Sequence, residues 1–189
     1  MTKLPGLVLV VSGPSGVGKS TALAELAKQP GVQVVISFTT RARRDNETED
    51  VDYHFVDERE FTDMVRRQEF LEWVEYDGHF YGTPHRAVDE ILERGGVAVL
   101  EIEREGAMAV KERFTHAVLV LLKPPFPGEL ERRLRSRGAS SEFLSRRLAL
   151  AERDAPLMDD LYDEFVTSTR TNETVRELRR IIQSRYSPR

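Results

Sequence analysis

One octapeptide near the N-terminus limits the possible folds of this chain more than any other feature. Residues 13–20 read GPSGVGKS, and they follow the apolar, β-branched run LVLVV at residues 7–11. Such a run is typical of a strand buried on both faces of a parallel sheet. A helical pattern follows from Lys19 to about Lys28. A glycine-rich loop between a buried strand and a helix surrounds a phosphate with backbone N–H groups and the positive end of the helix. The chain is therefore predicted to bind a nucleoside triphosphate.

The residue types within this loop predict a role for each position. Glycines let the backbone turn so that successive N–H groups point at phosphate oxygens. The ammonium group of Lys19 then reaches the β- and γ-phosphates of ATP, and the Ser20 hydroxyl binds the accompanying Mg²⁺. The predicted ATP-binding residues of the loop are Gly13, Pro14, Ser15, Gly16, Val17, Gly18, Lys19, Ser20 and Thr21. The alternative, a glycine turn beside a surface lysine, leaves the position between strand and helix unexplained.

Composition and charge indicate a soluble, weakly acidic chain. With 189 residues, 40% of them hydrophobic and 32% charged, it is long enough for one well-buried core and too polar for a membrane protein. A net charge of −4 argues against broad nucleic-acid binding, which requires a basic surface. The apolar run near the N-terminus is too short for a signal peptide or a membrane span, so a cytoplasmic location is expected.

Cysteine and histidine usage narrows the possible sites further. The chain contains no cysteine, which excludes disulfides and thiolate metal sites, and its four histidines lack the spacing of metal ligands. The sequence shows no clear apolar stripe for a subunit interface, so it does not determine an oligomeric state. The partners expected are small-molecule substrates.

Further buried runs indicate the architecture. Residues 97–102 and 117–122 resemble the first run, residues 164–168 form a weaker one, and helix-length segments lie between them. Strands that alternate with helices predict a right-handed, doubly wound α/β fold with a parallel sheet flanked by helices.

The pattern changes in two places, and each change predicts an insertion. Between residues 37 and 86, short aromatic segments are separated by charged residues and by Asp77-Gly78, a hairpin-type turn signal. This region is predicted to be a mixed, partly antiparallel subdomain. Residues 138–156 have a helical pattern and are predicted to form a mobile flap, or lid. The lid carries Arg146, Arg147 and Arg153.

The stretch 39-TTRARRDNETEDVDYHF-55 has the residues of a second phosphate site. Arg41 and Arg44 lie three apart, and Tyr53 begins a strand-like segment. Guanidinium groups bind phosphate through planar forked contacts, and a tyrosine hydroxyl donates a further hydrogen bond. Taken alone, the stretch also fits a solvated charged loop. Acidic and aromatic partners at residues 72–83 and 97–103 favour the phosphate site.

Six segments of the chain together carry a family resemblance. They are 13-GPSGVGKS-20, 37-SFTTRARR-44 with Glu47 and 52-DYHF-55, 70-FLEW-73, 80-FYGT-83, 101-EIEREG-106 and 133-RLRSRG-138. In this order they resemble the motifs of the guanylate kinase family, across almost the whole chain. The resemblance implies one P-loop NTPase-type domain over residues 1–189 that phosphorylates GMP, and also dGMP, with ATP and Mg²⁺. Its implied parts are a core of residues 1–36, 87–137 and 157–189, a GMP-binding subdomain of residues 37–86 and a lid of residues 138–156.

The resemblance also implies roles for individual residues. The implied GMP-binding residues are Ser37, Arg41, Arg44, Glu47, Tyr53, Glu72, Tyr81, Thr83 and Glu103, with Glu47 positioning an arginine. Independently of the family, a carboxylate such as Glu72 can accept both the N1–H and N2–H₂ donors of guanine, and adenine offers no such pair. Adenine would leave a buried Glu72 underpaired, at a cost of about 1–3 kcal/mol. The competing interpretation of Glu72 is a surface acid on a strand.

The remaining implied roles concern ATP and the transferred group. Glu101 ends a buried run, where an acid can hold Mg²⁺ together with Ser20. Arg133 is implied to bind ATP. Lys19, Arg41, Arg137 and Arg147 are the implied catalytic residues, because phosphoryl transfer is chiefly positioning and charge neutralisation. For Arg146 and Arg153, a solvated helix face is the better interpretation.

Several positions depart from the family pattern. Arg43 stands where the family has proline, Asn46 where it has the turn glycine, and Asp50 near a later glycine. Glu101 and Glu103 replace aspartates, and each reaches one methylene further. Residues 167–169 read TST where Val-Asn-Asp is common, so no adenine contact is assigned there. Two alternatives therefore remain: a guanylate-kinase-like binding module, and a kinase of a different phosphorylated acceptor.

Overall fold

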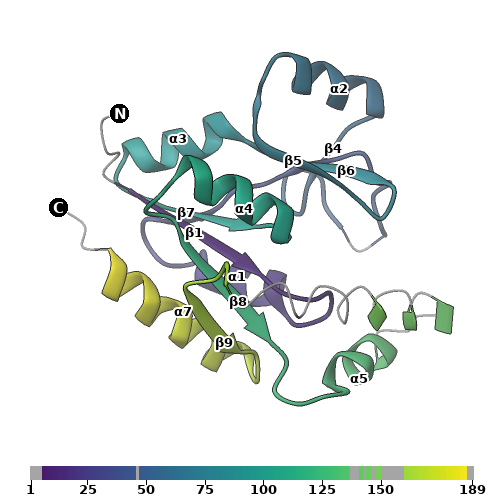
Figure 1. Cartoon of the computed structure of the whole chain (residues 1–189), viewed down its shortest axis with the longest axis vertical. Helices are drawn as coiled ribbons and strands as arrows, with labels where there is room; N and C mark the ends of the chain where they lie inside the picture. The colour runs from purple at the N-terminus through teal and green to yellow at the C-terminus, as the bar shows by residue number, and fades with distance from the viewer. Residues whose placement is uncertain are drawn as a thin grey trace.

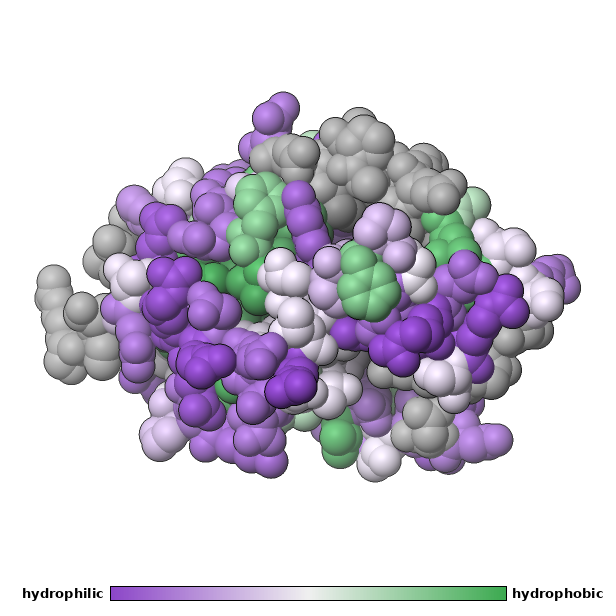
Figure 2. Space-filling model, turned by 90° about the horizontal axis from the view of Figure 1, so that it is seen from below, coloured by the Kyte–Doolittle hydropathy of each residue, from purple (hydrophilic) through white to green (hydrophobic). Residues whose placement is uncertain are grey.

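The computed structural model describes residues 6–45, 47–136, 141–142, 144–145, 148–149 and 160–186. These residues form two β-sheets with helices packed against them (Figure 1). Within this described part of the chain, no helix combines the length and apolar character needed to cross a membrane. On the face shown in Figure 2, hydrophilic residues predominate and hydrophobic ones are exposed only in small separate groups.

The larger sheet has five parallel strands in the order β2-β7-β1-β8-β9. The strands are β1 (Leu7–Ser12), β2 (Val32–Val34), β7 (Val97–Glu101), β8 (Val118–Lys123) and β9 (Glu164–Thr167). All six residues of β1 are buried, because this strand lies at the centre and pairs with β7 and β8. The apolar runs of the sequence thus become the middle of the sheet, and the predicted α/β fold is confirmed.

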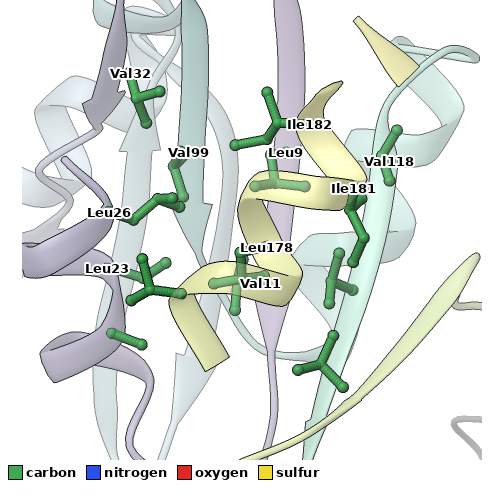
Figure 3. Packing of buried hydrophobic residues seen from close by; sticks show 14 of the residues in the cluster. Leu9, Val11, Leu23, Leu26, Val32, Val99, Val118, Leu178, Ile181 and Ile182 are labelled. Carbon is green, nitrogen blue, oxygen red and sulfur yellow. The ribbon is translucent and has the colours of Figure 1, made fainter. Parts of the chain in front are cut away.

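Helices cover both faces of this sheet. α1 (Lys19–Leu26) and α7 (Thr171–Arg185) pack on one face, where Leu9, Leu23 and Leu178 belong to one hydrophobic cluster (Figure 3). α3 (His85–Glu93) and α4 (Arg104–Arg113) pack on the other face and contribute to a second cluster. α5 (Glu129–Ser136) follows β8. The loops at the carboxyl ends of β1 and β7 are therefore held by a core packed on two sides.

The smaller sheet has four strands in the order β4-β3-β6-β5. They are β3 (Phe38–Thr39), β4 (His54–Phe55), β5 (Phe70–Tyr76) and β6 (His79–Pro84), and α2 (Glu58–Arg66) connects β4 to β5. Phe61 of α2 stacks on Phe70 and Phe80 of this sheet, with ring centroids 4.6 and 5.5 Å away. Within the smaller sheet, β3 pairs with β4 in parallel, and the β3–β6 and β5–β6 pairs are antiparallel.

Local sequence signals agree with several of these elements. The β5–β6 hairpin turns at Asp77 and Gly78, whose φ angles of 53° and 76° suit the tight turn predicted there. α1 ends at Leu26, two residues before the predicted end at Lys28. β2 was not predicted, because its three residues are too few to show a period. Most of the predicted lid, residues 138–156, lies outside the described residues.

Candidate nucleotide-binding site

A cleft of about 800 Å³ lies between the two sheets. One wall consists of the loop from β1 to α1 together with two acidic residues of β7 and its following loop. Glu101 is the last residue of β7, and Glu103 lies two residues beyond it. The opposite wall carries side chains of the smaller sheet and its loop, among them Arg41 and Glu72. The fold thus brings the two predicted phosphate sites to one cavity.

The β1–α1 loop has the backbone that its glycines permit. Gly13, Gly16 and Gly18 all have positive φ, at 148°, 84° and 106°, and a Cβ on Gly13 would lie 2.6 Å from the Leu122 carbonyl oxygen. Any other residue at these positions would be strained. Gly18 is the N-cap of α1, so the N-terminus of that helix points at the loop. The arrangement is that of an anion-binding loop.

Lys19 lies across this loop. Its Nζ donates to the Gly13 carbonyl oxygen at 2.5 Å and is 3.8 Å from Glu103 Oε1. The side chain is buried, at 8% exposed. The ammonium group is thus placed over the loop where phosphates would lie, with the nearby carboxylate as its counter-charge.

Ser20 and Glu101, the predicted metal ligands, lie side by side. Ser20 Oγ donates to Glu101 Oε1 at 3.1 Å. Burial raises the pKa of Glu101, while the positive charge of Lys19 and the bond from Ser20 act in the opposite direction. Hard oxygen donors beside a phosphate loop suit Mg²⁺, and a bound cation would also offset the burial of this carboxylate.

Arg133 is hydrogen-bonded to the backbone of the β1–α1 loop. Its guanidinium donates to the carbonyl oxygens of Val17 at 2.7 Å and Ser168 at 2.9 Å, and to Glu129 Oε1 at 2.6 Å. Ser168 Oγ donates to the same Val17 carbonyl at 2.6 Å. Sequence reasoning missed the roles of Glu129 and Ser168, since only the tertiary structure brings α5 and the loop after β9 to the phosphate loop. The predicted contact of Arg133 with ATP stays a prediction.

Arg41 and Glu47 form an ion pair at the centre of the predicted second phosphate site. Arg41 Nη1 and Nη2 donate to Glu47 Oε2 and Oε1 at 3.0 and 2.8 Å, and both side chains are mostly buried. Burial opposes the charge of each partner, yet their mutual hydrogen bonds raise the pKa of Arg41 and lower that of Glu47. Both groups therefore stay ionised, and Glu47 orients the guanidinium as the sequence predicted.

Aromatic rings surround this ion pair. The Arg41 guanidinium lies 5.6 Å from the centroid of the Tyr53 ring, and the Tyr53 and Tyr81 rings meet edge to face at 5.9 Å. Burial raises the pKa of the Tyr53 hydroxyl, so it remains a proton donor. Arg44 is half exposed, with Nη1 3.7 Å from Glu47 Oε1. The predicted phosphate ligands are thus gathered around the Arg41–Glu47 pair.

At two positions where this loop departs from the family pattern, the residue present makes a hydrogen bond or adopts a backbone conformation that suits the loop. Arg43, at the position of the family's proline, donates from Nη1 to the Glu47 carbonyl oxygen at 2.7 Å. Asp50 has a φ of 63°, a left-handed conformation that aspartate tolerates better than most residues. Its Oδ1 is 2.7 Å from His54 Nδ1. Asn46 lies outside the described residues.

The smaller sheet, with Ser37 just before its strand β3, carries three of the four predicted guanine contacts. Thr83 Oγ1 on β6 donates to Glu72 Oε1 on β5, and Ser37 Oγ lies 3.4 Å from Thr83 Oγ1. Glu72 is 7% exposed. Burial raises its pKa, and the bonds from Thr83 offset part of that shift. Glu103 pairs with Lys19 and lines the same cleft, so the structure joins three of the four predicted contacts, Ser37, Thr83 and Glu72, in one chain of polar contacts, and the fourth is not part of that chain.

Four arginines of the sequence analysis cannot be placed in this site. Arg137, Arg146, Arg147 and Arg153 lie outside the described residues. The catalytic roles of Arg137 and Arg147 stay predictions.

A doubly wound parallel sheet, a phosphate-type loop and a predicted second phosphate site in the same cleft are the features of a P-loop nucleoside monophosphate kinase. The sequence model of the guanylate kinase family matches residues 6–185 of this chain. The chain belongs to the guanylate kinase family.

Individual relatives agree with this assignment. A guanylate kinase of Prochlorococcus marinus subsp. pastoris is 40% identical over 179 residues, which cover 94% of this chain and 97% of that protein. One of Myxococcus xanthus is 46% identical over 150 residues, covering 79% and 72%. The crystal structure of guanylate kinase from Anaplasma phagocytophilum superposes with a TM-score of 0.75 at 30% identity, covering 97% and 88%. The predicted enzyme class is thereby confirmed.

Proposed function

We propose that this chain transfers the γ-phosphoryl group of ATP to GMP, and also to dGMP, forming ADP and GDP or dGDP. The observation that carries the proposal is the shared cleft, which has the phosphate loop on one wall and Arg41, Tyr53 and Glu72 on the other. The proposed compartment is the cytoplasm, where both nucleotides are available.

In the proposed reaction, an oxygen of the GMP phosphate bonds to the γ-phosphorus as the bond from that phosphorus to the β,γ-bridging oxygen breaks. The GMP phosphate is already ionised, so no general base is required. Catalysis then depends on alignment and on neutralising the equatorial oxygens. Lys19, whose Nζ donates to the Gly13 carbonyl oxygen of the loop, would contact the β- and γ-phosphates, and Glu47 would orient the Arg41 guanidinium for the acceptor phosphate.

The donor side would include a metal ion. Ser20 and Glu101 are the residues that would hold it. Mg²⁺ bound with ATP supplies charge neutralisation at the β- and γ-phosphate oxygens. Arg133 is proposed to support the ATP site, and Arg137 and Arg147 to reach the transferred group from a lid of residues 138–156 that excludes water. The division into a core, a GMP-binding subdomain of residues 37–86 and this lid belongs to the same proposal.

Base selection is assigned to the smaller sheet. The Glu72 carboxylate would accept the N1–H and N2–H₂ donors of guanine, while Thr83 and Ser37 hold that carboxylate or bond to the base. Arg44, Tyr81 and Glu103 complete the proposed GMP site.

A substrate panel tests the proposal. ADP formation is measured with ATP, Mg²⁺ and each of GMP, dGMP, AMP, CMP and UMP. The expected result is turnover with GMP and dGMP, and a value of kcat/KM for AMP lower by about tenfold to a hundredfold or more. Turnover with another acceptor alone would refute the GMP assignment. The absence of turnover with every acceptor, together with retained binding of acidic or phosphorylated peptides, would instead support a binding module.

A further inference from the structure

Gly106 lies where the core touches the proposed guanine site. It is the third residue of α4 and is buried. A Cβ built on it would lie 2.6 Å from Oε2 and 3.0 Å from Cδ of Glu72. Carbon and oxygen atoms do not approach so closely without a bond, so any side chain at this position would displace the Glu72 carboxylate.

The carboxylate is confined on its other sides as well. Thr83 Oγ1 donates to its Oε1, and only 7% of the residue is exposed. The same added Cβ would be 3.4 Å from Cβ of Ile102, an ordinary contact distance, so Glu72 is the neighbour with which it clashes. The carboxylate is therefore held between β6 and the first turn of α4.

The Glu72 carboxylate lies beside the N-terminal turn of α4. The first turn of a helix carries unpaired N–H groups and the positive end of the helix dipole. A glycine there lets the Glu72 carboxylate approach that end of the helix closely. α4 begins directly after Glu101 and Glu103, so the same turn connects the guanine site to the phosphate wall.

We propose that Gly106 is a specificity-determining positioning residue: its lack of a side chain fixes the place from which Glu72 reads guanine. The inference rests on the proposed function and deepens it. Guanine presents two donors to this carboxylate, and hypoxanthine presents only N1–H. The preference for GMP over IMP therefore measures where the carboxylate lies, because a displaced carboxylate cannot reach both donors.

The first test is Gly106→Ala. Alanine is the better helix former, and the clashing atom is the end of a side chain, so the variant should fold. We expect KM for GMP to rise about tenfold or more and the preference for GMP over IMP to fall by a similar factor, while KM for ATP stays unchanged. GMP binding is also followed by the fluorescence of Trp73, the chain's one tryptophan, which neighbours Glu72.

The second test adds Glu72→Asp, which withdraws the carboxylate by one methylene. If position is what matters, this change should be harmful in the wild-type background and much less harmful, or beneficial, when it is combined with Gly106→Ala. Met108→Ala is the control, because Met108 is an exposed residue of the same helix. It should leave both KM values and the GMP-to-IMP preference unchanged.

The outcomes separate the two proposals. If the wild-type enzyme does not phosphorylate GMP, the proposed function fails first. If it does, and Gly106→Ala retains its KM for GMP and its GMP-to-IMP preference, the role of Gly106 is refuted. Should the single variant fail to fold, the double variant decides: recovery of folding and of GMP preference supports the steric contact, and a double variant no better than the single one overturns it.

Discussion

The two predicted phosphate sites of the cleft are built in different ways. The β1–α1 loop would bind phosphate through its backbone and is held by β1, every residue of which is buried. The acceptor loop, residues 40–53, would bind phosphate through side chains and runs between β3 and β4, which have two residues each. The first site is kept in shape by apolar packing and the second by a buried ion pair.

This difference explains which sequence changes each site tolerates. The backbone of the β1–α1 loop requires glycine at Gly13, where an added Cβ would meet a carbonyl oxygen. The acceptor loop has lost a proline and a glycine of the family pattern, yet Arg43 bonds to the Glu47 carbonyl and Asp50 adopts a left-handed conformation. Other residue types can replace the side-chain hydrogen bonds of the acceptor loop, whereas only glycine fits the backbone conformation of the β1–α1 loop at Gly13.

Removing the ammonium group of the first site should have the largest effect and should separate the two sites. We expect Lys19→Ala to lower kcat by about 10²–10³, because a preorganised charge at the transferring group is lost. The affinity for GMP, measured by calorimetry, should change little. Lys28→Ala, at an exposed residue, is the control. If Lys19→Ala lowered the affinity for GMP by as large a factor as it lowers kcat, the two sites would not be independent.

Changing the base-reading carboxylate should come next. Glu72→Gln should raise KM for GMP about tenfold to a hundredfold, because its amide N–H₂ would face the donors of guanine. Burial raises the pKa of Glu72, so on acidification it gains a proton at a higher pH than an ordinary glutamate with a pKa of about 4.3. KM for GMP in the wild-type enzyme should therefore rise as pH falls, and in Glu72→Gln it should stay high and flat. A flat wild-type profile down to about pH 5 would contradict this.

The ion pair of the acceptor loop is the next target. Glu47→Gln leaves the buried Arg41 without its counter-charge, so we expect the free energy of unfolding to fall by about 2–4 kcal/mol and KM for GMP to rise about tenfold. Urea unfolding and the coupled assay measure the two effects. Glu90→Gln breaks the exposed Arg86–Glu90 pair and should change neither. Equal stability of the two variants would mean that this ion pair does not hold the acceptor loop together.

The smallest effect is expected from the residue that replaces the family's proline. Arg43→Ala removes one hydrogen bond to the Glu47 carbonyl and should raise KM for GMP about fivefold, equivalent to about 1 kcal/mol, without changing KM for ATP. Arg59→Ala, on the exposed face of α2, serves as the comparison. If KM for GMP is unchanged in Arg43→Ala, the loop is held by Glu47 alone.

Much of the donor side was predictable because its signals are local. A buried run, a glycine loop and a helix follow one another within residues 7–28, and each imposes its own backbone. The hairpin at Asp77-Gly78 was predictable for the same reason, whereas the pairing role of Glu47 was implied by the family resemblance. β2 was missed because three residues carry too little pattern, and the residues behind the phosphate loop were missed because Ser168 is distant from it in sequence.

The sequence by itself determined the architecture, the phosphate loop and the family, since alternating buried strands and helices, glycine positions and ordered motifs are all written along the chain. Only the tertiary structure decided how the sites are held. The bonds from Arg133 and Ser168 to Val17, and the contact of Gly106 with Glu72, join segments that meet after the sheets have packed. The identity of such partners depends on distances of a few ångströms between elements, which no local pattern encodes.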